Sequence, residues 1–437
     1  MKKLLIISVI FFVSFSVRSQ VPAMSWEFIY ENENKMGRDI AHTLDSCYIV
    51  TATNSDFDYG LTLKLDTAGN VIWSCPYGGR TVTSLSDSNY IIAGGLNYNA
   101  AFLRKIDADG NSLWQKTYGA SGQDNFKFVI ETADSNLLAG GYSHSPLKSG
   151  YLVKTDLEGN LIWERRFVSQ EYATTTDVVE WEGYFYVVGR FEDYNYEYAL
   201  FAARVDQTGN LDWYNTYEGG PYDYSVLIGE DEKLFVAGGT HITKINPNGE
   251  QVWSKYLSEP VRIFLIQPTA DNKYIAAGRK HYGSGWYSAP LMAKLDTAGN
   301  LIWSKTWYGP ELSGDCFESI LVARDHGYVG CGYSDYGSSD YKIRVIKTDP
   351  DPDVITGFDA EDTSDNDLVI CPNPTDGRFT IDGGTFDHIA VYHISGKKIL
   401  ETYGPDPIIN LVDYPAGLYF VRTKSDGKTL TGKVILK

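Results

Sequence analysis

The stretch Lys64–Ser74 reads KLDTAGNVIWS, and Lys294–Ser304 reads KLDTAGNLIWS, so ten of eleven residues recur 230 positions later. Four variants of its first ten residues lie between the two copies: KIDADGNSLW from Lys105, KTDLEGNLIW from Lys154, RVDQTGNLDW from Arg204 and KINPNGEQVW from Lys244. The six tryptophans that end these phrases are spaced by 41, 49, 50, 40 and 50 residues. Periods of this length are typical of propeller blades or helical repeats.

The residues of each phrase predict a β-hairpin. In the first copy, Lys64–Asp66 ends one strand and Val71–Trp73 begins the next. We expect Asp66 to cap the turn with its side chain and Gly69 to take the left-handed conformation that ends it. Neighbouring segments such as YIIAGG and KLFVAGG are short, rich in β-branched residues and bounded by turn formers. They predict strands and not helices.

Counting these strands predicts an all-β, seven-bladed propeller over residues 20–349. Each period holds four strand-like segments, the number in a propeller blade. The first tryptophan strand, Trp26–Tyr30, has no strand before it, and the last lysine strand, Tyr341–Asp349, has no tryptophan strand after it. We therefore expect the N-terminal strand to complete the last four-stranded blade, which would hide two strand edges.

The phrase resembles the tryptophan-docking motif of pyrroloquinoline-quinone propellers and of related non-catalytic outer-membrane assembly propellers. This resemblance covers Trp26 to about Asp349 and implies that each tryptophan packs between neighbouring blades. The expected docking residues are Trp26, Trp73, Trp114, Trp163, Trp213, Trp253 and Trp303. Quinoprotein dehydrogenases normally have eight blades and a calcium site, whereas this chain has seven predicted blades and no matching triad, so we expect no cofactor.

The first 19 residues have the features of a signal peptide. Lys2 and Lys3 precede an apolar run over Leu4–Phe15, and small residues follow, so we expect cleavage between Ser19 and Gln20. No other apolar run is long enough to cross a membrane as a helix. The net charge of −18 disfavours nucleic acid and anionic lipid as partners.

The composition changes after Asp349. Residues 350–367 hold seven acidic residues and no basic one, which predicts a solvated linker. Residues 368–437 then resemble the type A C-terminal sorting domain of the type IX secretion system of Bacteroidota. Four elements carry this resemblance in order: Pro372, Asn373 and Pro374 with Gly377; Ile389–Leu400; Leu411–Arg422 with Gly417 and Tyr419; and Lys433–Lys437.

The sorting-domain resemblance implies a small immunoglobulin-like β-sandwich that is recognised by the type IX secretion machinery. It also implies a protein that crosses both membranes and is then released or attached to the cell surface, usually after cleavage of the sorting domain. The separate terminal module and its acidic linker fit this role, since exposed linkers are preferred sites of proteolysis.

The cysteines predict neither a disulfide scaffold nor a metal site. There are five, an odd number, and no two have the CxxC spacing of a thiolate zinc site. A turn near Arg324–Gly327 would place Cys331 opposite about Ile320, so we expect Cys316 and Cys331 to be free buried thiols. Asp107–Asn111 begins like a calcium loop but lacks the acidic residue that should close it, so we expect no bound metal.

One face of the predicted propeller carries loops rich in aromatic, Gly, Ser and Asp residues. These loops are Asn54–Gly60, Phe191–Tyr198, Lys280–Ser288 and Ser334–Tyr341. Sugars stack on flat aromatic rings while their hydroxyl groups bond to neighbouring polar side chains, and protein partners use the same residue types. We expect ligand contacts from Tyr194, Tyr196, Trp286 and Tyr336.

These patterns favour a non-catalytic recognition or scaffold module that binds glycan or protein outside the cell. The alternative is a carbohydrate-active enzyme, a lyase or hydrolase, with carboxylates on the aromatic loop face. No HExxH or GxSxG motif supports catalysis. Two carboxylates and a His or Tyr within ~6 Å on that face, with raised pKa values, would favour the enzyme. A pure structural spacer, the third possibility, predicts no concave pocket.

Overall fold

The computed structural model divides into two compact units, residues 1–352 and 353–437. It describes residues 22–31, 34–54, 60–96, 100–119, 123–144, 149–167, 172–193, 195, 197–257, 260–282, 287–307, 314–336, 340–351, 368–371, 375–382, 387–393, 398–403, 408–412, 414–415, 417–425 and 428–436. The expected signal cleavage site, Ser19 and Gln20, lies outside this part. The described residues contain no helix, and hence none that could span a membrane.

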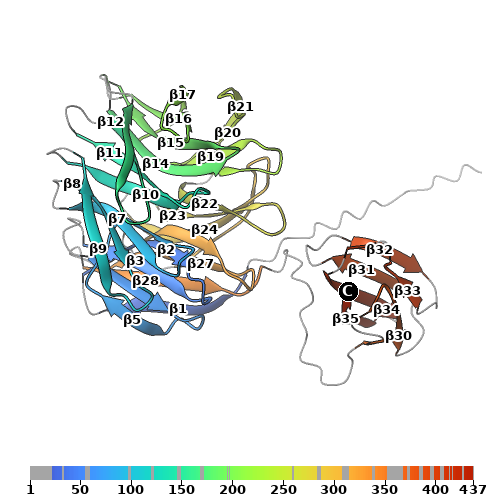
Figure 1. The fold of residues 1–437 in the computed structure, drawn as a ribbon. Coiled ribbons are helices and arrows are strands. Elements are labelled where there is room, and N and C mark those ends of the chain that lie inside the picture. Colours follow the sequence, from blue (N-terminus) through green and yellow to red (C-terminus); the bar gives the residue numbers. More distant parts are fainter. Residues whose placement is uncertain are drawn as a thin grey trace, which may run out of the picture. The chain divides into compact units, whose positions relative to one another are not determined.

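The first unit consists of seven four-stranded antiparallel sheets. Figure 1 shows their strands in the colours of the sequence. Three sheets, in order from the first strand outward, are β2 (Met36–His42), β3 (Tyr48–Thr53), β4 (Gly60–Leu65) and β5 (Val71–Cys75); β6 (Thr81–Ser84), β7 (Tyr90–Leu96), β8 (Ala100–Ile106) and β9 (Ser112–Tyr118); and β10 (Asn125–Glu131), β11 (Leu137–Ser143), β12 (Ser149–Thr155) and β13 (Leu161–Phe167).

The next three sheets are β14 (Tyr172–Trp181), β15 (Tyr184–Glu192), β16 (Tyr198–Asp206) and β17 (Leu211–Glu218); β18 (Ser225–Ile228), β19 (Leu234–Gly238), β20 (His241–Ile245) and β21 (Gln251–Tyr256); and β22 (Val261–Pro268), β23 (Tyr274–His281), β24 (Ser288–Leu295) and β25 (Leu301–Thr306). The seventh is β26 (Cys316–Val322), β27 (Tyr328–Asp335), β28 (Tyr341–Thr348) and β1 (Met24–Tyr30).

The seven sheets form a closed ring. The first strand of each sheet contacts the first strand of the next, and β26 of the last sheet contacts β2 of the first. The N-terminal strand β1 is the outer strand of the last sheet, where Trp26 lies opposite Lys347 and Tyr30 opposite Ile343 in an antiparallel ladder with β28. These contacts confirm the seven-bladed propeller and its closure by the N-terminal strand.

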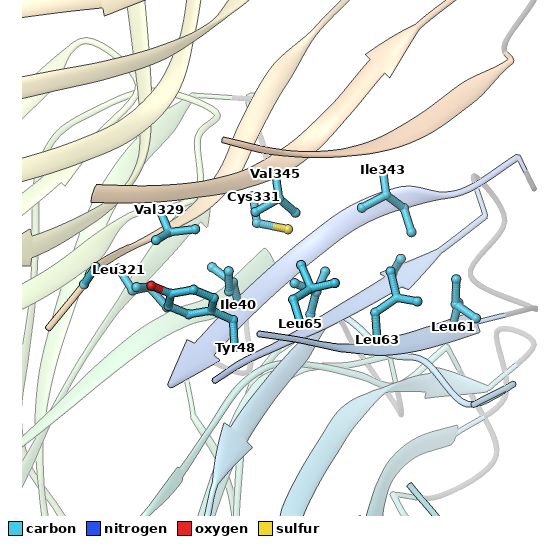
Figure 2. Packing of buried hydrophobic residues seen from close by; sticks show 13 residues of the cluster. Ile40, Tyr48, Leu61, Leu63, Leu65, Leu321, Val329, Cys331, Ile343 and Val345 are labelled. Atoms are coloured by element: carbon cyan, nitrogen blue, oxygen red, sulfur yellow. The ribbon is translucent and has the colours of Figure 1, made fainter. Parts of the chain in front are cut away.

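A hydrophobic seam joins the last blade to the first. Figure 2 shows its centre, where Leu63 and Leu65 of β4 lie across from Ile343 and Val345 of β28. All four side chains are fully buried. Burying an aliphatic side chain of this size contributes roughly 1.5–3 kcal/mol. Trp26, Phe28 and Tyr30 of β1 pack against the same cluster, so the closing strand is held by apolar contacts and by its ladder.

Six of the seven repeated tryptophans rest on the repeated glycine of the next blade, and the seventh, Trp303, packs near Tyr328 of the last blade. A β-carbon at Gly69 would lie 2.9 Å from the indole ring of Trp26, and Gly110 meets Trp73 in the same way at 3.0 Å. The pairs that follow are Trp114 with Gly159, Trp163 with Gly209, Trp213 with Gly249 and Trp253 with Gly299. The indole nitrogen of Trp26 donates to the carbonyl of Thr67 at 3.0 Å, so this contact crosses the ring closure. Glycine is required both for its positive φ of 86° at Gly69 and for room for the indole.

The lysines that end the third strands are buried and paired with aspartates. Lys64 Nζ lies 2.7 Å from Asp45 Oδ2, and Lys154 Nζ lies 2.7 Å from Asp134 Oδ2. The same pairing joins Lys105 to Asp87, Lys244 to Asp231, Lys294 to Asp271 and Lys347 to Asp325. Each aspartate stands in the turn between the first two strands of its own blade, so the pair ties a buried strand end to that turn. In the fourth blade the pattern changes, because Arg204 pairs with Asp212 of the outer strand.

The chain end after the last strand is anchored, which corrects one expectation. Asp351 falls within the predicted linker, residues 350–367, but it is only 1% exposed. Its carboxylate lies 2.5 Å from Lys294 Nζ and accepts a hydrogen bond from the Tyr328 hydroxyl. The backbone nitrogen of Asp351 donates to the carbonyl of His326. Asp351 therefore belongs to the propeller, and its charge neutralises a buried lysine.

The cysteine register also differs from the expectation by one residue. Cys331 lies opposite Ser319 because the turn runs from Ala323 to Gly327 and sets this register. The β-bulge between Phe317 and Ser319 comes after this pair and places Cys316 opposite Tyr333. Cys316 and Cys331 are buried free thiols, as predicted.

The second unit is a two-sheet β-sandwich, which confirms the predicted fold of the C-terminal segment. One sheet holds β29 (Val369–Cys371), β30 (Arg378–Asp382) and β33 (Ile408–Asn410), and the other holds β32 (Lys398–Tyr403), β31 (His388–His393), β34 (Gly417–Ser425) and β35 (Lys428–Leu436). Its core contains Phe379 and Ile381 from the first sheet and Val391, Val421 and Val434 from the second.

The anchor at Asp351 can be tested by substitution. Asp351→Asn removes one of the two aspartates that pair with the fully buried Lys294 and leaves Asp271 in place, so we expect the free energy of unfolding of the propeller to fall by about 2 kcal/mol. Urea unfolding of the mature chain measures this change. Asp340→Asn is the matched control, because Asp340 pairs with Lys342 at the surface and should matter by less than about 1 kcal/mol. Equal effects of the two variants would contradict the anchor.

Candidate functional site

The first strands of all seven blades line a central cavity of about 680 Å³. β-Bulges in five of these strands insert an extra residue, between Gly37 and Asp39 in β2, Phe126 and Phe128 in β10, Thr175 and Asp177 in β14, Ile263 and Leu265 in β22, and Phe317 and Ser319 in β26. A bulge re-aims the extra side chain, and here the extra residues include Arg38, Lys127 and Glu318, which all line the cavity.

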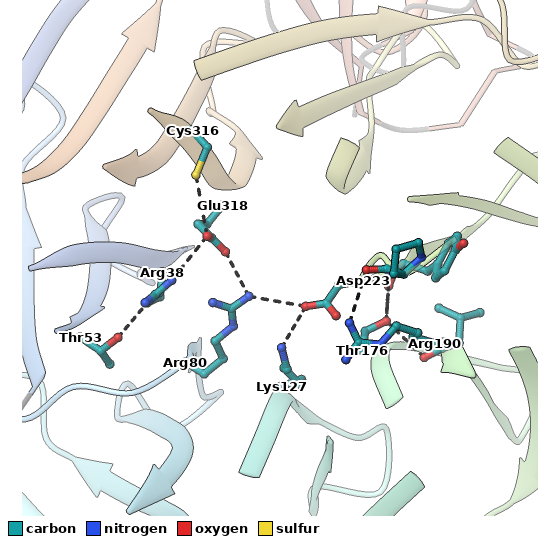
Figure 3. A network of polar contacts seen from close by, with 12 residues as sticks. Arg38, Thr53, Arg80, Lys127, Thr176, Arg190, Asp223, Cys316 and Glu318 are labelled. Atoms are coloured by element: carbon teal, nitrogen blue, oxygen red, sulfur yellow. Dashed lines mark hydrogen bonds and ion pairs between the residues drawn. The ribbon is translucent and has the colours of Figure 1, made fainter. Parts of the chain in front are cut away.

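Ion pairs connect these side chains across the blades, as Figure 3 shows. Arg80 is central, with its guanidinium 3.0 Å from Glu318 and 3.7 Å from Asp223. Arg38 lies 3.4 Å from Glu318, and Lys127 lies 2.9 Å from Asp223. The network therefore joins residues that are up to 280 positions apart in the sequence.

The two carboxylates of this network are held in their charged form. Burial alone would raise the pKa of Glu318, but the charges of Arg80 and Arg38 outweigh it and lower the pKa. Burial opposes ionisation of Asp223 too, and Lys127, Arg80 and Arg190 hold its pKa well below the ordinary value. A general acid for glycoside chemistry needs a raised pKa, so these carboxylates are poor candidates for that role.

Two further aspartates of the cavity wall bind neighbouring blades together. Asp39 accepts hydrogen bonds from the Thr81 hydroxyl at 2.7 Å and from the Val82 backbone nitrogen at 3.0 Å. Asp177 accepts equivalent bonds from Ser225 and Val226 at 2.7 and 2.9 Å. Burial raises the pKa of Asp39, and it raises the pKa of Asp177 to about 6. These carboxylates hold adjacent first strands together.

The lining is basic in an acidic protein. Its cations are Arg38, Arg80, Lys127, Arg190, Arg262 and Arg279. Its carboxylates are Asp39, Asp177, Asp223 and Glu318. Within the part of the chain that the structure describes, no three His, Cys, Asp or Glu side chains gather closely enough to hold a metal ion. The arrangement is suited to binding and orienting a polar ligand.

The predicted aromatic residues do not form this cavity as far as they are described. Tyr194, Tyr196 and Trp286 lie outside the described residues. Tyr336 follows β27, is half-buried and is not among the residues that line the cavity. Its pKa is raised, mainly by burial. Ligand contact by these four residues stays a prediction.

The reasoning from sequence missed the charged residues of the cavity. A signal was present, because single charged residues interrupt or precede the apolar first strand of successive blades, at Arg38, Arg80, Lys127, Arg262 and Glu318. These residues come from five different blades, and nothing in the sequence brings them together before the ring is closed. Sequence reasoning also had no means of locating the bulges that turn these side chains inward.

The structure describes part of the sorting motif. Tyr419 is buried and its hydroxyl donates to the carbonyl of Pro415 at 2.6 Å, while Lys433 is exposed on β35. Gly377 has a φ of 117°, and a β-carbon there would lie 2.7 Å from Val412. Gly417 begins β34. Pro372, Asn373, Pro374 and Lys437 lie outside the described residues.

Residues 369–437 match the family described as the secretion system C-terminal sorting domain. The protein is an exported cargo of type IX secretion. It is therefore secreted or held at the cell surface. No curated protein matches the chain.

Solved structures show the propeller fold alone. A catalytically inactive virginiamycin B lyase from Staphylococcus aureus with quinupristin is 12% identical, with a TM-score of 0.51, over 74% of this chain and 98% of that one. A structure of streptogramin B lyase gives the same values. BBS1N in complex with ARL6DN is 13% identical, with a TM-score of 0.50, over 76% of this chain and 98% of that one.

The raised pKa of Asp177 predicts a specific pH dependence of stability. The Asp177 carboxyl keeps its proton up to about pH 6 in the folded state but only up to about pH 4 in the unfolded state. The free energy of unfolding therefore falls as the pH rises between these values. Asp177→Asn removes this loss, and the variant should gain up to about 3 kcal/mol relative to the wild type between pH 4 and 7. Urea unfolding of both proteins at pH 4 and at pH 7 measures this gain. A difference in stability between variant and wild type that is the same at both pH values would contradict the prediction.

Proposed function

We propose that the propeller is a non-catalytic recognition module that binds a glycan or protein outside the cell, with the mouth of its central cavity as the binding seat. The observation that carries this proposal is the convergence of charged side chains from several blades in one cavity of about 680 Å³. This volume lies within the range of ordinary ligand sites. A pure structural spacer would not need such a cavity.

The electrostatics of the cavity favour binding over catalysis. Arg80 and its neighbours keep Glu318 and Asp223 charged, and Asp39 and Asp177 accept hydrogen bonds from the next blade. A lyase or hydrolase would need a carboxylate or another titrating group free to exchange a proton with its substrate. The raised pKa values of Asp39 and Asp177 are a feature that an enzyme would share, but both carboxylates already accept hydrogen bonds from the next blade.

The route to the cell exterior completes the proposal. The signal peptide, residues 1–19, would be removed between Ser19 and Gln20, and the sorting domain would engage the type IX machinery of a Bacteroidota bacterium. Cleavage would then fall in residues 353–367, after the buried Asp351, so that the released propeller keeps its anchor. In the folded protein the seven repeated tryptophans, from Trp26 to Trp303, would serve the ring and not the ligand.

A glycan array on the mature chain, residues 20–437, tests the proposed function. We expect at least one glycan to bind. Lys127→Met should weaken that binding at least fivefold, because Lys127 lines the cavity and shares Asp223 with Arg80, so its loss changes the charge of the whole network. Lys116→Met on the outer strand β9 is the matched control and should leave binding unchanged. A silent array would refute the glycan version, and hits that ignore Lys127→Met would refute the location.

A further inference from the structure

Three arginines of the cavity make no salt bridge with a described residue. Glu318 is shared by Arg38 and Arg80, and Asp223 is shared by Arg80 and Lys127. Within the described part of the chain, Arg190, Arg262 and Arg279 make no salt bridge, although all three line the cavity. Arg190 still acts on Asp223, whose pKa it helps to lower, so the positive charge that lacks a counter-ion among the described residues is that of Arg262 and Arg279.

Two of these arginines face each other directly. Arg262 of β22 and Arg279 of β23 are partners in the antiparallel ladder. Like charges at opposed positions destabilise a sheet, so this pair costs stability in the absence of a counter-ion. The Nε atom of Arg279 is buried and has no hydrogen-bond partner among the described residues. Burial and the charges of Arg279 and Arg262 also hold the pKa of nearby His281 below its ordinary value.

Aromatic rings hold both guanidinium groups in place. The guanidinium carbon Cζ of Arg262 lies 5.2 Å from the centre of the Tyr222 ring, and Cζ of Arg279 lies 5.6 Å from the centre of the Phe264 ring. A cation–π contact holds a guanidinium near the ring while its N–H groups can still donate to an anion. The Tyr222 and Phe264 side chains line the same cavity. The pair is thus a preorganised donor set for a planar or tetrahedral oxyanion.

We infer that Arg262 and Arg279, with Arg190 nearby in the cavity, form the seat for the oxyanion of an acidic saccharide, a carboxylate or a sulfate group. This inference rests on the proposed function and names its ligand class. A cavity of about 680 Å³ admits a short saccharide or a chain end but not the surface of a folded protein. The cations that line the cavity attract an anion locally, although the protein as a whole carries a net charge of −18.

Isothermal titration calorimetry on the mature chain tests the inference. The probes are trigalacturonate for the carboxylate, a sulfated lactose for the sulfate, neutral cellotriose and the peptide triglutamate. We expect at least one acidic saccharide to bind at least tenfold more tightly than cellotriose and triglutamate. The double variant Arg262→Gln with Arg279→Gln should weaken this binding at least tenfold, and the exposed control Arg165→Gln should change it less than twofold.

A measurement without ligand guards against simple misfolding. If the arginine pair is kept for a ligand, Arg279→Gln relieves its repulsion and should raise the melting temperature, with a smaller rise at high salt. A lower melting temperature would show that the pair serves the fold and would overturn the inference.

The outcomes separate this inference from the proposed function. Equal binding of cellotriose and the acidic saccharides, or binding that ignores the double variant, overturns the anion seat and leaves a recognition module intact. Equal binding of triglutamate overturns the saccharide assignment. If no probe binds, the seat is refuted, and the glycan array alone decides the proposed function.

Discussion

The pairing of β1 with β28 is the constraint on which the rest of the structure depends. The blades of a propeller form a ring only when the first and last parts of the chain pair with each other. Here the paired strands are more than 310 residues apart in the sequence, and the hydrogen bond from Arg344 to Glu27 is one of the contacts between them. The ladder, the apolar seam of Leu63, Leu65, Ile343 and Val345, and the indole of Trp26 on the first blade all act at this joint. Closing the ring removes two exposed strand edges, which are a general liability in β proteins.

Ring closure also creates the candidate site. The first strands point their bulged residues toward a common axis, so charges from separate blades are brought within 4 Å of one another, as Arg80, Glu318 and Asp223 are. Buried charges are tolerated when they are paired, and Arg80 joins two carboxylates in this way. Arg262 and Arg279 make no salt bridge within the described part of the chain, and we take them to point to a ligand.

Much of the fold could be predicted from the sequence, because the same short pattern recurs in six copies and each copy predicts the same hairpin. The recurring Gly and Trp of KLDTAGNVIW indicated the hairpin, and the unmatched strand at Trp26–Tyr30 indicated the closure. Local register was less predictable, since a turn over Ala323–Gly327 places Cys331 opposite Ser319 and not Ile320. The repeated lysines served as markers of strand ends, but their aspartate partners became visible only in three dimensions.

The candidate site was largely beyond the reach of the sequence. Arg38, Arg80 and Glu318 look like ordinary surface charges until the ring places them around one axis, and Asp351 looks like part of an acidic linker until Lys294 is found beneath it. Long-range contacts of this kind carry no local pattern. The sorting tail was different, because its short motifs are local and were readable directly.

Complementation of the closing strand tests the central claim most directly. A chain that begins at residue 32 lacks β1, and a synthetic peptide of residues 22–31 supplies it. The account predicts that this shortened chain unfolds at a lower temperature than the mature chain, that the peptide restores the transition, and that a peptide with Trp26→Ala restores it less. A shortened chain as stable as the mature chain, with no response to either peptide, would show that β1 does not close the ring.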